Sequence, residues 1–319
     1  MTNPVHSFKK SLQISLSALA LSMLPFGPAM ADSRTVETAF GPVDIEGQPQ
    51  RVVTLYEGAL DATLAVGGNA VGAVITRGGS DVAEYIKSEA GSIAIVGAPA
   101  ETNIEAVIAA RPDLILAPPR INRQQVDLLS RIAPVVASNV PLFEPDSWER
   151  ETRLYARALG REAEGENAIA RVRSRIDEVA QIVQARIPAD QRDATLVRWM
   201  PQGPLVMAEG LFSAALLQAV GFELNDNGLV KEGRPHSEPL SLENLSSMDQ
   251  NWIFLATLNE DGKQALSSAQ SSPAFARLNA VQKGQVINVD GQLWTSATGP
   301  LAALAILDDI EAAVNAIQP

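Results

Sequence analysis

The stretch Asn-Ile-Glu-Ala-Val-Ile-Ala-Ala-Arg-Pro-Asp-Leu-Ile-Leu-Ala-Pro-Pro-Arg, residues 103–120, predicts a short helix followed by a buried strand. The Asn103 side chain can accept a bond from a free N–H group at a helix start, and Glu105 is favoured there by the helix dipole. Pro112 lacks an N–H group and ends the helix. The unbroken apolar run 114–117 is typical of a strand buried on both faces of a parallel sheet.

A second stretch repeats this design far downstream. Residues 241–256 align with residues 103–118 without a gap when Glu243 is placed on Glu105. Both stretches then carry an acidic residue in the first helical turn and an apolar strand in the same register. A single similarity of this length is weak evidence for a true internal repeat, but it favours two similarly built α/β lobes.

Composition places the chain among ordinary globular proteins and limits its partners. The 319 residues are 46% hydrophobic and 19% charged, and the formal net charge is −12. An acidic surface argues against nucleic acid and anionic membrane as partners. The sequence contains no cysteine, which excludes disulfides, thiolate nucleophiles and cysteine-ligated metal.

The N-terminus has the pattern of a secretory signal peptide. Lys9 and Lys10 precede a short apolar segment, residues 12–24, and Ala29-Met30-Ala31 supplies a small-x-small cleavage site. The alternative, a transmembrane anchor, is disfavoured because the apolar run is too short to span a bilayer. Without a cysteine at the cleavage point the chain is not a bacterial lipoprotein. We therefore expect a signal peptide at 1–31, cleavage after Ala31, and a mature chain free in the periplasm.

Alternating strand and helix patterns on either side of one long amphipathic run predict the domain organisation. The run 164–187 would span about 35 Å as a helix. We expect an N-terminal α/β lobe at 32–160, a linker helix at 161–188 and a C-terminal α/β lobe at 189–319. The main expected elements are a hairpin at 36–45, strands at 51–55, 70–75, 92–96, 134–137, 194–199, 205–208 and 286–289, helices at 59–65, 124–132, 213–220 and 301–317, and loops at 225–239 and 294–300.

Enzyme motifs are missing from the sequence. It has no Gly-x-Ser-x-Gly, Walker, Gly-x-Gly-x-x-Gly or His-Glu-x-x-His pattern. The mature chain would keep a single histidine, His236, which excludes a zinc site rich in histidine. A serine–histidine–aspartate triad is not excluded by this count, so a periplasmic hydrolase with His236 as its base stays open as an alternative.

Arginines, aromatic residues and the one histidine follow several predicted strands. In an acidic protein, arginines converging on one cleft suit an anionic ligand, because guanidinium pairs with carboxylate or catecholate oxygens in a fork. The alternative is that each arginine is a surface residue without a role. The ligand-binding candidates are Tyr56, Arg77, Arg120, Arg198, Trp199, Arg234, His236 and Trp294.

Several short segments in a fixed order resemble class III periplasmic substrate-binding proteins, the ferric-siderophore and vitamin B12 receptors of ABC importers. Each segment is weak evidence alone, and together they cover essentially the whole mature chain. The segments are Pro49-Gln-Arg-Val-Val-Thr-Leu55, Ala65-Val-Gly-Gly-Asn-Ala-Val-Gly72, Val96-Gly97 with Asn103-Ile-Glu105, Arg111-Pro-Asp-Leu-Ile-Leu116, Arg131-Ile-Ala-Pro134, Ser241-Leu-Glu243, and Trp294 with Gly299-Pro-Leu-Ala-Ala303.

The resemblance implies an α/β fold of two lobes with mainly parallel sheets, joined by a single long helix, with the ligand held between them and little hinge motion. It also implies a monomer that catalyses no reaction and holds no permanent cofactor. Its partners would be a ferric siderophore and an ABC importer permease dimer in the inner membrane. Glu105 and Glu243, one in each lobe, would dock onto arginines of that permease.

For the ligand, the resemblance to ferric-catecholate binders matches Arg120 to a cleft arginine and His236 to a histidine able to ligate the iron of the chelate. Two departures matter. Leu293 stands where a second, tyrosine ligand is expected, and Pro99 stands where hydroxamate binders have a cleft arginine. The expected ligand is thus an anionic ferric siderophore of catecholate or carboxylate type, such as ferric citrate. Heme or a cobalamin-like corrinoid, with an axial tyrosine or histidine, is the alternative within the family.

Overall fold

The computed structural model describes residues 1–2, 33–141 and 143–317. The predicted signal-peptide core and its cleavage site therefore lie outside the described residues. Residues 32–319 form one compact unit, separate from residues 1–31. Since the two predicted lobes belong to this same unit, their boundaries stay a prediction. None of the described helices is long and apolar enough to cross a membrane.

The first lobe is built on a five-stranded parallel sheet in the order β5-β4-β3-β8-β9. These strands are β3 (Val52–Thr54), β4 (Ala70–Ala73), β5 (Ala94–Ile95), β8 (Leu114–Ala117) and β9 (Val135–Ala137). Two small antiparallel pairs are added, β1 (Ser33–Thr38) with β2 (Gly41–Glu46) and β6 (Gly97–Ala98) with β7 (Glu101–Thr102). The helices are α1 (Glu57–Ala65), η1 (Glu84–Ile86), α2 (Lys87–Ala90), α3 (Ile104–Ala110), α4 (Arg123–Leu129) and α5 (Ser147–Leu159).

The stretch 103–120 folds as its sequence predicts. The Asn103 side chain accepts a 3.0 Å hydrogen bond from the Ala106 N–H group and caps α3. Arg111 adopts a left-handed conformation directly before Pro112 and ends the helix. All four residues of β8 are fully buried at the centre of the sheet. This order delivers Pro118 and the residues after it to the carboxyl edge of the sheet.

The second lobe contains a mixed sheet in the order β11-β10-β13-β14, with β12 pairing β10. Its strands are β10 (Asp193–Met200), β11 (Gly203–Val206), β12 (Glu223–Leu224), β13 (Trp252–Thr257) and β14 (Val286–Asp290); only β11 is antiparallel to its neighbour. The helices are η2 (Ala189–Gln191), α7 (Phe212–Ala219), η3 (Leu242–Met248), α8 (Glu260–Gln270), α9 (Pro273–Ala276), α10 (Asn279–Gln282), α11 (Gly291–Ser296) and α12 (Pro300–Asn315).

Two local predictions in the second lobe were wrong, and one helix was not predicted. The stretch 294–300, predicted as a loop, begins inside α11, because Asp290 accepts a 2.8 Å bond from the Leu293 N–H group and caps a helix there. The echoed helix after Ser241 is the 3₁₀ helix η3 rather than an α-helix. The sequence pattern did not predict α8, which Asn259 caps by accepting from the Gly262 N–H group.

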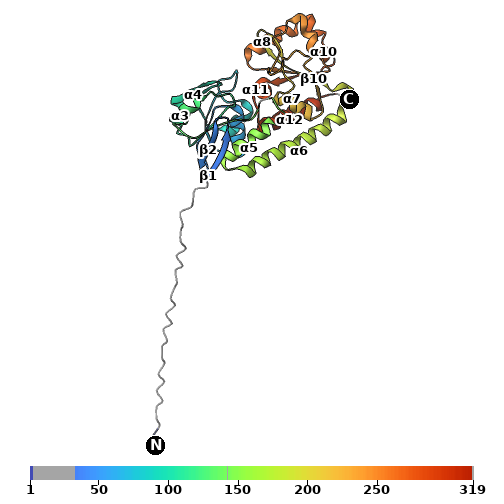
Figure 1. The fold of residues 1–319 in the computed structure, drawn as a ribbon. Helices are drawn as coiled ribbons and strands as arrows, with labels where there is room; N and C mark the ends of the chain where they lie inside the picture. The colour runs from blue at the N-terminus through green and yellow to red at the C-terminus, as the bar shows by residue number, and fades with distance from the viewer. Residues whose placement is uncertain (3–32, 142, 318–319) are drawn as a thin grey trace. The chain divides into compact units, whose positions relative to one another are not determined.

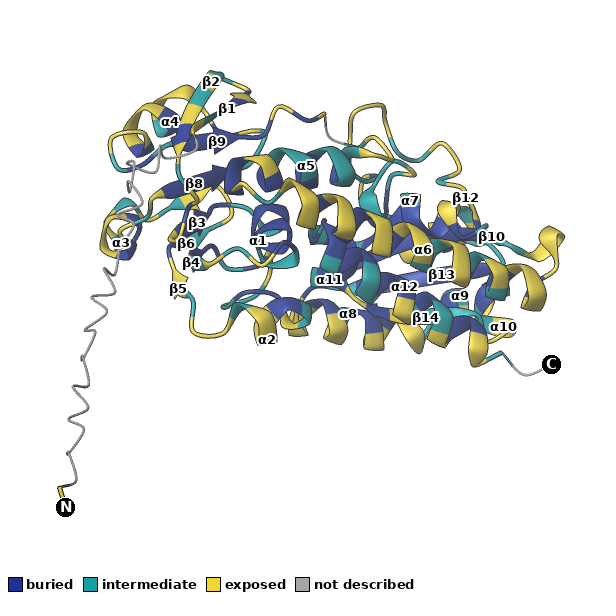
Figure 2. Cartoon of the chain, turned by 90° about the horizontal axis from the view of Figure 1, so that it is seen from below, coloured by how far each residue is buried: buried dark blue, intermediate teal, exposed yellow. Residues whose placement is uncertain are grey.

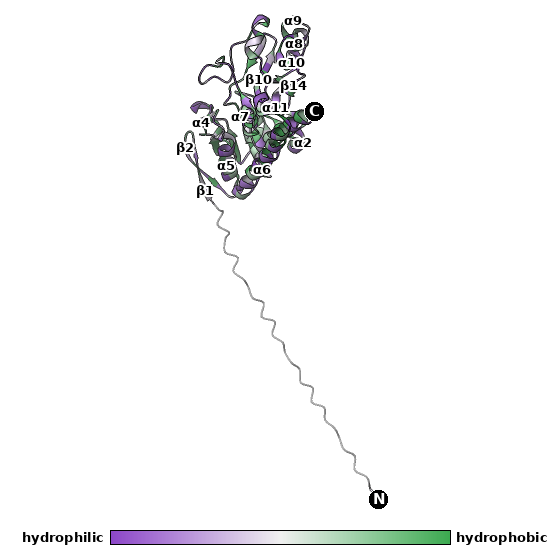
Figure 3. Cartoon of the chain, turned by 90° about the vertical axis from the view of Figure 1, so that its right-hand side faces the viewer, coloured by the Kyte–Doolittle hydropathy of each residue, from purple (hydrophilic) through white to green (hydrophobic). Residues whose placement is uncertain are grey.

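The predicted linker is the helix α6 (Glu162–Arg186), which runs along α5 and α12 (Figure 1). Its inner stripe is buried and its outer face is exposed and hydrophilic (Figures 2 and 3). The Arg175 guanidinium on α6 pairs with the Asp308 and Glu311 carboxylates of α12. The long helix is therefore fixed by packing and ion pairs to both of its neighbours.

Candidate functional site

The carboxyl ends of the two sheets face each other. Gly78, in the loop after β4, approaches Leu258, after β13, so closely that an added Cβ atom would lie 3.2 Å from the Leu258 Cβ atom. Gly79 approaches the Gln292 side-chain amide, and a Cβ atom there would lie 3.0 Å from its Nε2 atom. Ligands of open α/β sheets bind outside such strand ends. The cleft between the lobes is therefore the candidate site.

Asp61 joins the two lobes beside this cleft. It lies in α1, is fully buried, and accepts the N–H groups of Leu301 at 2.9 Å and Ala302 at 2.8 Å, in the first turn of α12. The Tyr85 hydroxyl donates a third bond at 3.0 Å. Burial raises the pKa of Asp61 to about 7, while these three donors oppose the rise. The carboxylate thus satisfies free N–H groups of one lobe from a helix of the other.

Arg198, at the carboxyl end of β10, is a buried cation without a partner acid. It is 8% exposed, and its Nε atom has no hydrogen-bond partner among the described residues. Burial and the nearby charge of Arg77 lower the pKa of Arg198. None of the ion pairs found among the described residues includes either arginine. Arg77, from the first lobe, is thus close enough for its charge to act on Arg198 of the second, and an anion bound between them would neutralise both.

The other two predicted arginines, like Arg77, are exposed. Arg120 is exposed directly after β8, and Arg234 is exposed in the loop between β12 and η3. Neither takes part in an ion pair found in the described part of the chain. The structure gives no contact that brings them to Arg77 and Arg198, so their role in binding stays a prediction.

His236 is half-buried and lies on the same face of the second sheet as Arg198. Arg198 pairs with Leu205 of β11, and Met207, two residues further, pairs with His236. Because side chains two residues apart in a strand point to one face, these four residues share a face. The His236 Nδ1 atom lies 2.7 Å from the Ser237 carbonyl oxygen, which can only accept, so Nδ1 carries the proton. In the neutral ring, Nε2 then keeps a lone pair for a ligand.

Two of the predicted aromatic residues belong to the core of the second lobe. Trp199 is 2% exposed and packs edge-on against Phe275 with ring centroids 6.0 Å apart. Trp294 is 1% exposed, stacks on Phe254 at 5.3 Å, and donates its indole N–H to the Asp309 carboxylate. The ring faces pack within the core, so the expected role of Trp199 and Trp294 as a platform for ligand rings stays a prediction.

Glu151 is a buried carboxyl group in the cleft that the sequence pattern did not single out. It lies on α5, accepts a long 3.4 Å bond from the Tyr56 hydroxyl, and its Oε1 atom has no partner among the described residues. Burial raises the pKa of Glu151 to about 7, and the Ser138 and Tyr56 hydroxyls oppose this. One feature of the sequence does indicate a buried carboxyl group here: Glu151 is a charged residue next to the apolar stripe of Trp148, Thr152 and Tyr155.

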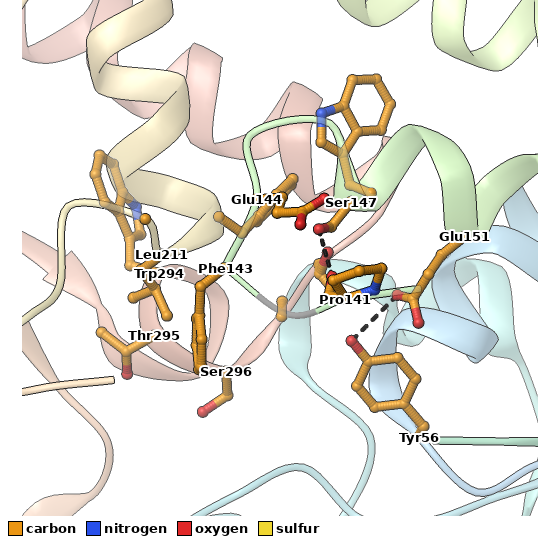
Figure 4. A pocket seen from close by; sticks show the side chains of 15 residues that line it. Tyr56, Pro141, Phe143, Glu144, Ser147, Glu151, Leu211, Trp294, Thr295 and Ser296 are labelled. Carbon is orange, nitrogen blue, oxygen red and sulfur yellow. Dashed lines mark hydrogen bonds between the residues drawn. The ribbon is translucent and has the colours of Figure 1, made fainter. Parts of the chain in front are cut away.

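Glu151 and Tyr56 border a cavity of about 160 Å³ between the lobes (Figure 4). Trp294 and Ser296 border it from the second lobe, and the Ser296 hydroxyl also has no hydrogen-bond partner among the described residues. Of the residues predicted to bind ligand, Tyr56 and Trp294 line this cavity and the arginines do not. The cleft therefore contains two separate features, an arginine pair and a cavity with an acidic group.

Comparison with known proteins identifies the family. The model of the periplasmic binding protein family matches residues 52–293. The chain belongs to this family. Its class III architecture, predicted above, is confirmed by structural similarity to Staphylococcus aureus SirA complexed with staphyloferrin B, with a TM-score of 0.75 and 28% identity over 88% of this chain and 98% of that chain.

Curated relatives of this periplasmic binding protein include two from Bacillus subtilis. The probable siderophore-binding lipoprotein YfiY is 29% identical over 88% of this chain and 87% of its own length. The Fe(3+)-citrate-binding protein YfmC is 26% identical over 84% of this chain and 82% of its own length. This periplasmic binding protein is thus similar to iron-chelate receptors along nearly its whole described length.

The two carboxylates predicted to dock on a permease are exposed in this periplasmic binding protein. Glu105 lies in the first turn of α3 and Glu243 in the first turn of η3, one in each lobe. Neither makes an ion pair found among the described residues. The described residues also contain no group of three or more histidine, cysteine, aspartate or glutamate side chains that could hold a metal ion.

Proposed function

We propose that this chain is a periplasmic receptor that captures an anionic ferric siderophore and delivers it to an ABC importer, without catalysing a reaction. The observation that carries the proposal is Arg198, a buried guanidinium with an unpartnered Nε atom and Arg77 beside it. A buried Arg198 guanidinium without an acid partner is costly in the empty cleft, and the nearby charge of Arg77 adds to this cost. An anionic chelate that binds between the lobes would remove this cost.

Within this class of ligand, a ferric carboxylate fits the cleft better than a ferric catecholate. Catechol rings would need aromatic faces to pack on, and Trp199 and Trp294 use theirs inside the core. Carboxylate oxygens need only the guanidinium forks of Arg77 and Arg198, with Arg120 and Arg234 at the rim. The similarity to a ferric-citrate-binding protein supports the same choice.

His236 is proposed as a direct contact to the iron of the chelate. Its Nδ1 proton is engaged by Ser237, so the lone pair on Nε2 can enter a coordination position that a citrate-type chelator leaves open. A single imidazole is a weak iron site by itself. The iron therefore belongs to the ligand, and the protein holds no resident metal.

Delivery would use Glu105 and Glu243. Each carboxylate is exposed, and their placement in matched positions of the two lobes suits contact with basic residues of a dimeric permease. The basic N-terminus and Ala29-Met30-Ala31 support export to the periplasm, where we propose that the chain acts as a monomer. A Glu105→Gln, Glu243→Gln double variant should bind ferric chelate normally and fail to support growth on it.

The function is tested by tryptophan-fluorescence titration of the mature protein with ferric citrate, a ferric catecholate, a ferric hydroxamate, heme and cobalamin. We expect saturable quenching by ferric citrate, weaker quenching by the catecholate, and none by the other three. Quenching by heme or cobalamin alone would overturn the ferric-chelate assignment while leaving the family unchanged. A protein that binds none of the five would contradict the receptor function.

A further inference from the structure

We propose that the cavity bordered by Glu151 and Tyr56 is a subsite for a protonated amine, so that the protein recognises an alkylammonium group. This deepens the proposed function, because the ligand would then be a chelate with an anionic iron-binding end and a cationic end. A free small amine presents the same group, and the experiment below separates the two sources.

The cavity has the hydrogen-bonding pattern of a site made to receive a donor. Glu151 is 5% exposed and its Oε1 atom has no partner among the described residues. The Ser296 hydroxyl, on the opposite lobe, is also buried without a partner. Buried polar groups are normally paired, and two unpaired oxygens at one cavity indicate a missing donor. An ammonium group has three N–H donors and can satisfy both, with a third bond to spare for water or Tyr56.

The charges around the cavity select for a cation. No lysine, arginine or histidine is among the lining residues. The second lining carboxylate, Glu144, is already neutralised by Arg150 at 2.6 Å, so Glu151 is the carboxyl group left for a ligand. A carboxylate or phosphate placed here would lie against Glu151 with no cation to offset it. The cavity is thus opposite in sign to the Arg77 and Arg198 pair elsewhere in the cleft.

Aromatic rings form much of the remaining wall. Tyr56 and Trp148 border the cavity from the first lobe, and Phe212 borders it from the second. Trp294 also borders it, with its ring stacked on Phe254 (Tyr56 and Trp294 are labelled in Figure 4). Trp148 and Phe212 contact each other edge to face with centroids 6.5 Å apart. Aromatic faces attract ammonium groups through the ring quadrupole, whereas they offer nothing comparable to anions. A carboxyl group inside an aromatic wall is therefore matched to an alkylammonium ion.

Binding of an amine would also move a proton. The groups that face Glu151 are the hydroxyls of Tyr56, Tyr155 and Ser138, with no cation among them, and burial raises the pKa of Glu151 to about 7 in the empty cavity. An ammonium ion against Oε1 lowers that pKa and expels the proton. At pH 7, amine binding should therefore release a fraction of a proton, which calorimetry in buffers of different ionisation heat measures.

The test uses a citrate-based chelator bearing one free primary amine and the same chelator with that amine acetylated, both loaded with ferric iron, together with ethylammonium alone. We expect the free-amine chelate to bind about tenfold more tightly than its acetylated form. Glu151→Gln should abolish this difference and the proton release. Glu162→Gln, an exposed carboxylate on α6, is the matched control and should behave as wild type.

The outcomes separate the subsite from the proposed function. Equal binding of the free-amine and acetylated chelates, with no binding of ethylammonium, would overturn the subsite and leave the receptor function standing. Binding of ethylammonium without binding of any ferric chelate would keep the subsite and overturn the receptor function. If Glu151→Gln lowers the thermal stability, Tyr56→Phe supplies the second test, since it keeps the ring and removes the hydroxyl; the proposal predicts a smaller loss of the amine preference.

Discussion

Two buried carboxyl groups, Asp61 and Glu151, lie between the same two lobes with opposite surroundings. Asp61 receives three donors, from Leu301, Ala302 and Tyr85. Glu151 accepts one long bond from Tyr56, has the Ser138 hydroxyl beside it, and keeps its Oε1 atom without a partner among the described residues. Burial raises the pKa of each to about 7. The two carboxyl groups therefore do not differ in burial or in pKa, but in the number of hydrogen-bond donors that they receive. The satisfied carboxyl joins the lobes, and the unsatisfied one is available to a ligand.

The same contrast separates two arginines. Arg175, on α6, pairs with Glu178, Asp308 and Glu311. Burial lowers the pKa of Arg175, but Asp308 and Glu311 outweigh it and raise the pKa. Arg198, on β10, has no acid partner among the described residues, and its pKa is lowered. The ion-paired guanidinium of Arg175 stabilises the empty protein. The unpaired guanidinium of Arg198 destabilises it and is available to bind an anionic ligand. Substitutions can remove the paired and the unpaired groups one at a time.

The largest expected effect is on the satisfied carboxyl. Asp61→Ala leaves two N–H groups of α12 and the Tyr85 hydroxyl without their acceptor. We expect a loss of about 4 kcal/mol in the free energy of unfolding, which lowers the melting temperature by about 10 °C. Asp61→Asn keeps one acceptor oxygen and should lose about half as much. A melting temperature unchanged in both variants would show that Asp61 does not join the lobes.

A smaller effect is expected from pH. Because the folded-state pKa values of Asp61 and Glu151 are raised from 3.8 and 4.5 to about 7, the folded protein binds more protons than the unfolded chain between about pH 4 and pH 7. Stability is therefore greatest below this range and falls as the pH rises through 7. Between pH 5 and pH 8 we expect each of the two groups to contribute a loss of about 2 kcal/mol, which thermal unfolding at a series of pH values measures.

The pH effect has its own control. Asp61→Asn and Glu151→Gln should each flatten the dependence, since each removes one titrating group. Asp81 and Glu166, whose pKa values are lowered by Lys87 and Arg153, titrate below this range and should leave it unaffected when changed to amides. A melting temperature that rises from pH 5 to pH 8 would contradict the raised pKa values.

The smallest effect distinguishes the two arginines in the empty protein. Arg175→Gln breaks partly exposed ion pairs between α6 and α12, and should cost about 1 kcal/mol. Arg198→Gln removes an unpaired buried charge and should cost nothing or raise the stability slightly. Urea unfolding without ligand measures both. A larger loss for Arg198→Gln than for Arg175→Gln would mean that Arg198 has a partner acid after all.

The sequence predicted the framework because local signals and the global fold agree there. Asn103, Pro112 and the apolar run 114–117 produce α3 and β8 as expected. The failures have local causes. Asp290 and Asn259 cap α11 and α8, whereas the sequence pattern predicts a loop from residue 294 and no helix at 260–270.

The site was harder to predict, because it depends on which side chains two distant segments bring together. Arg198 and Trp199 are neighbours at a strand end, yet the alternation of β10 directs them to opposite faces, one into the cleft and one into the core. Glu151 was overlooked because its neighbours on α5 are apolar, although a charged residue in such a stripe signals a buried charge. The proximity of Arg77 and Arg198, which lie in different lobes, cannot be predicted from the sequence of either segment alone.

The measurement that tests the central claim most directly is the affinity for ferric citrate of the wild-type mature protein, Arg198→Gln and Arg175→Gln, determined by calorimetry. Both variants lose one arginine, but only one loses an arginine of the cleft. We predict that Arg198→Gln binds about 100-fold more weakly, whereas Arg175→Gln binds as wild type does. Equal affinity for all three proteins would contradict the account, because the unpaired arginine of the cleft would then not be the group that holds the anion.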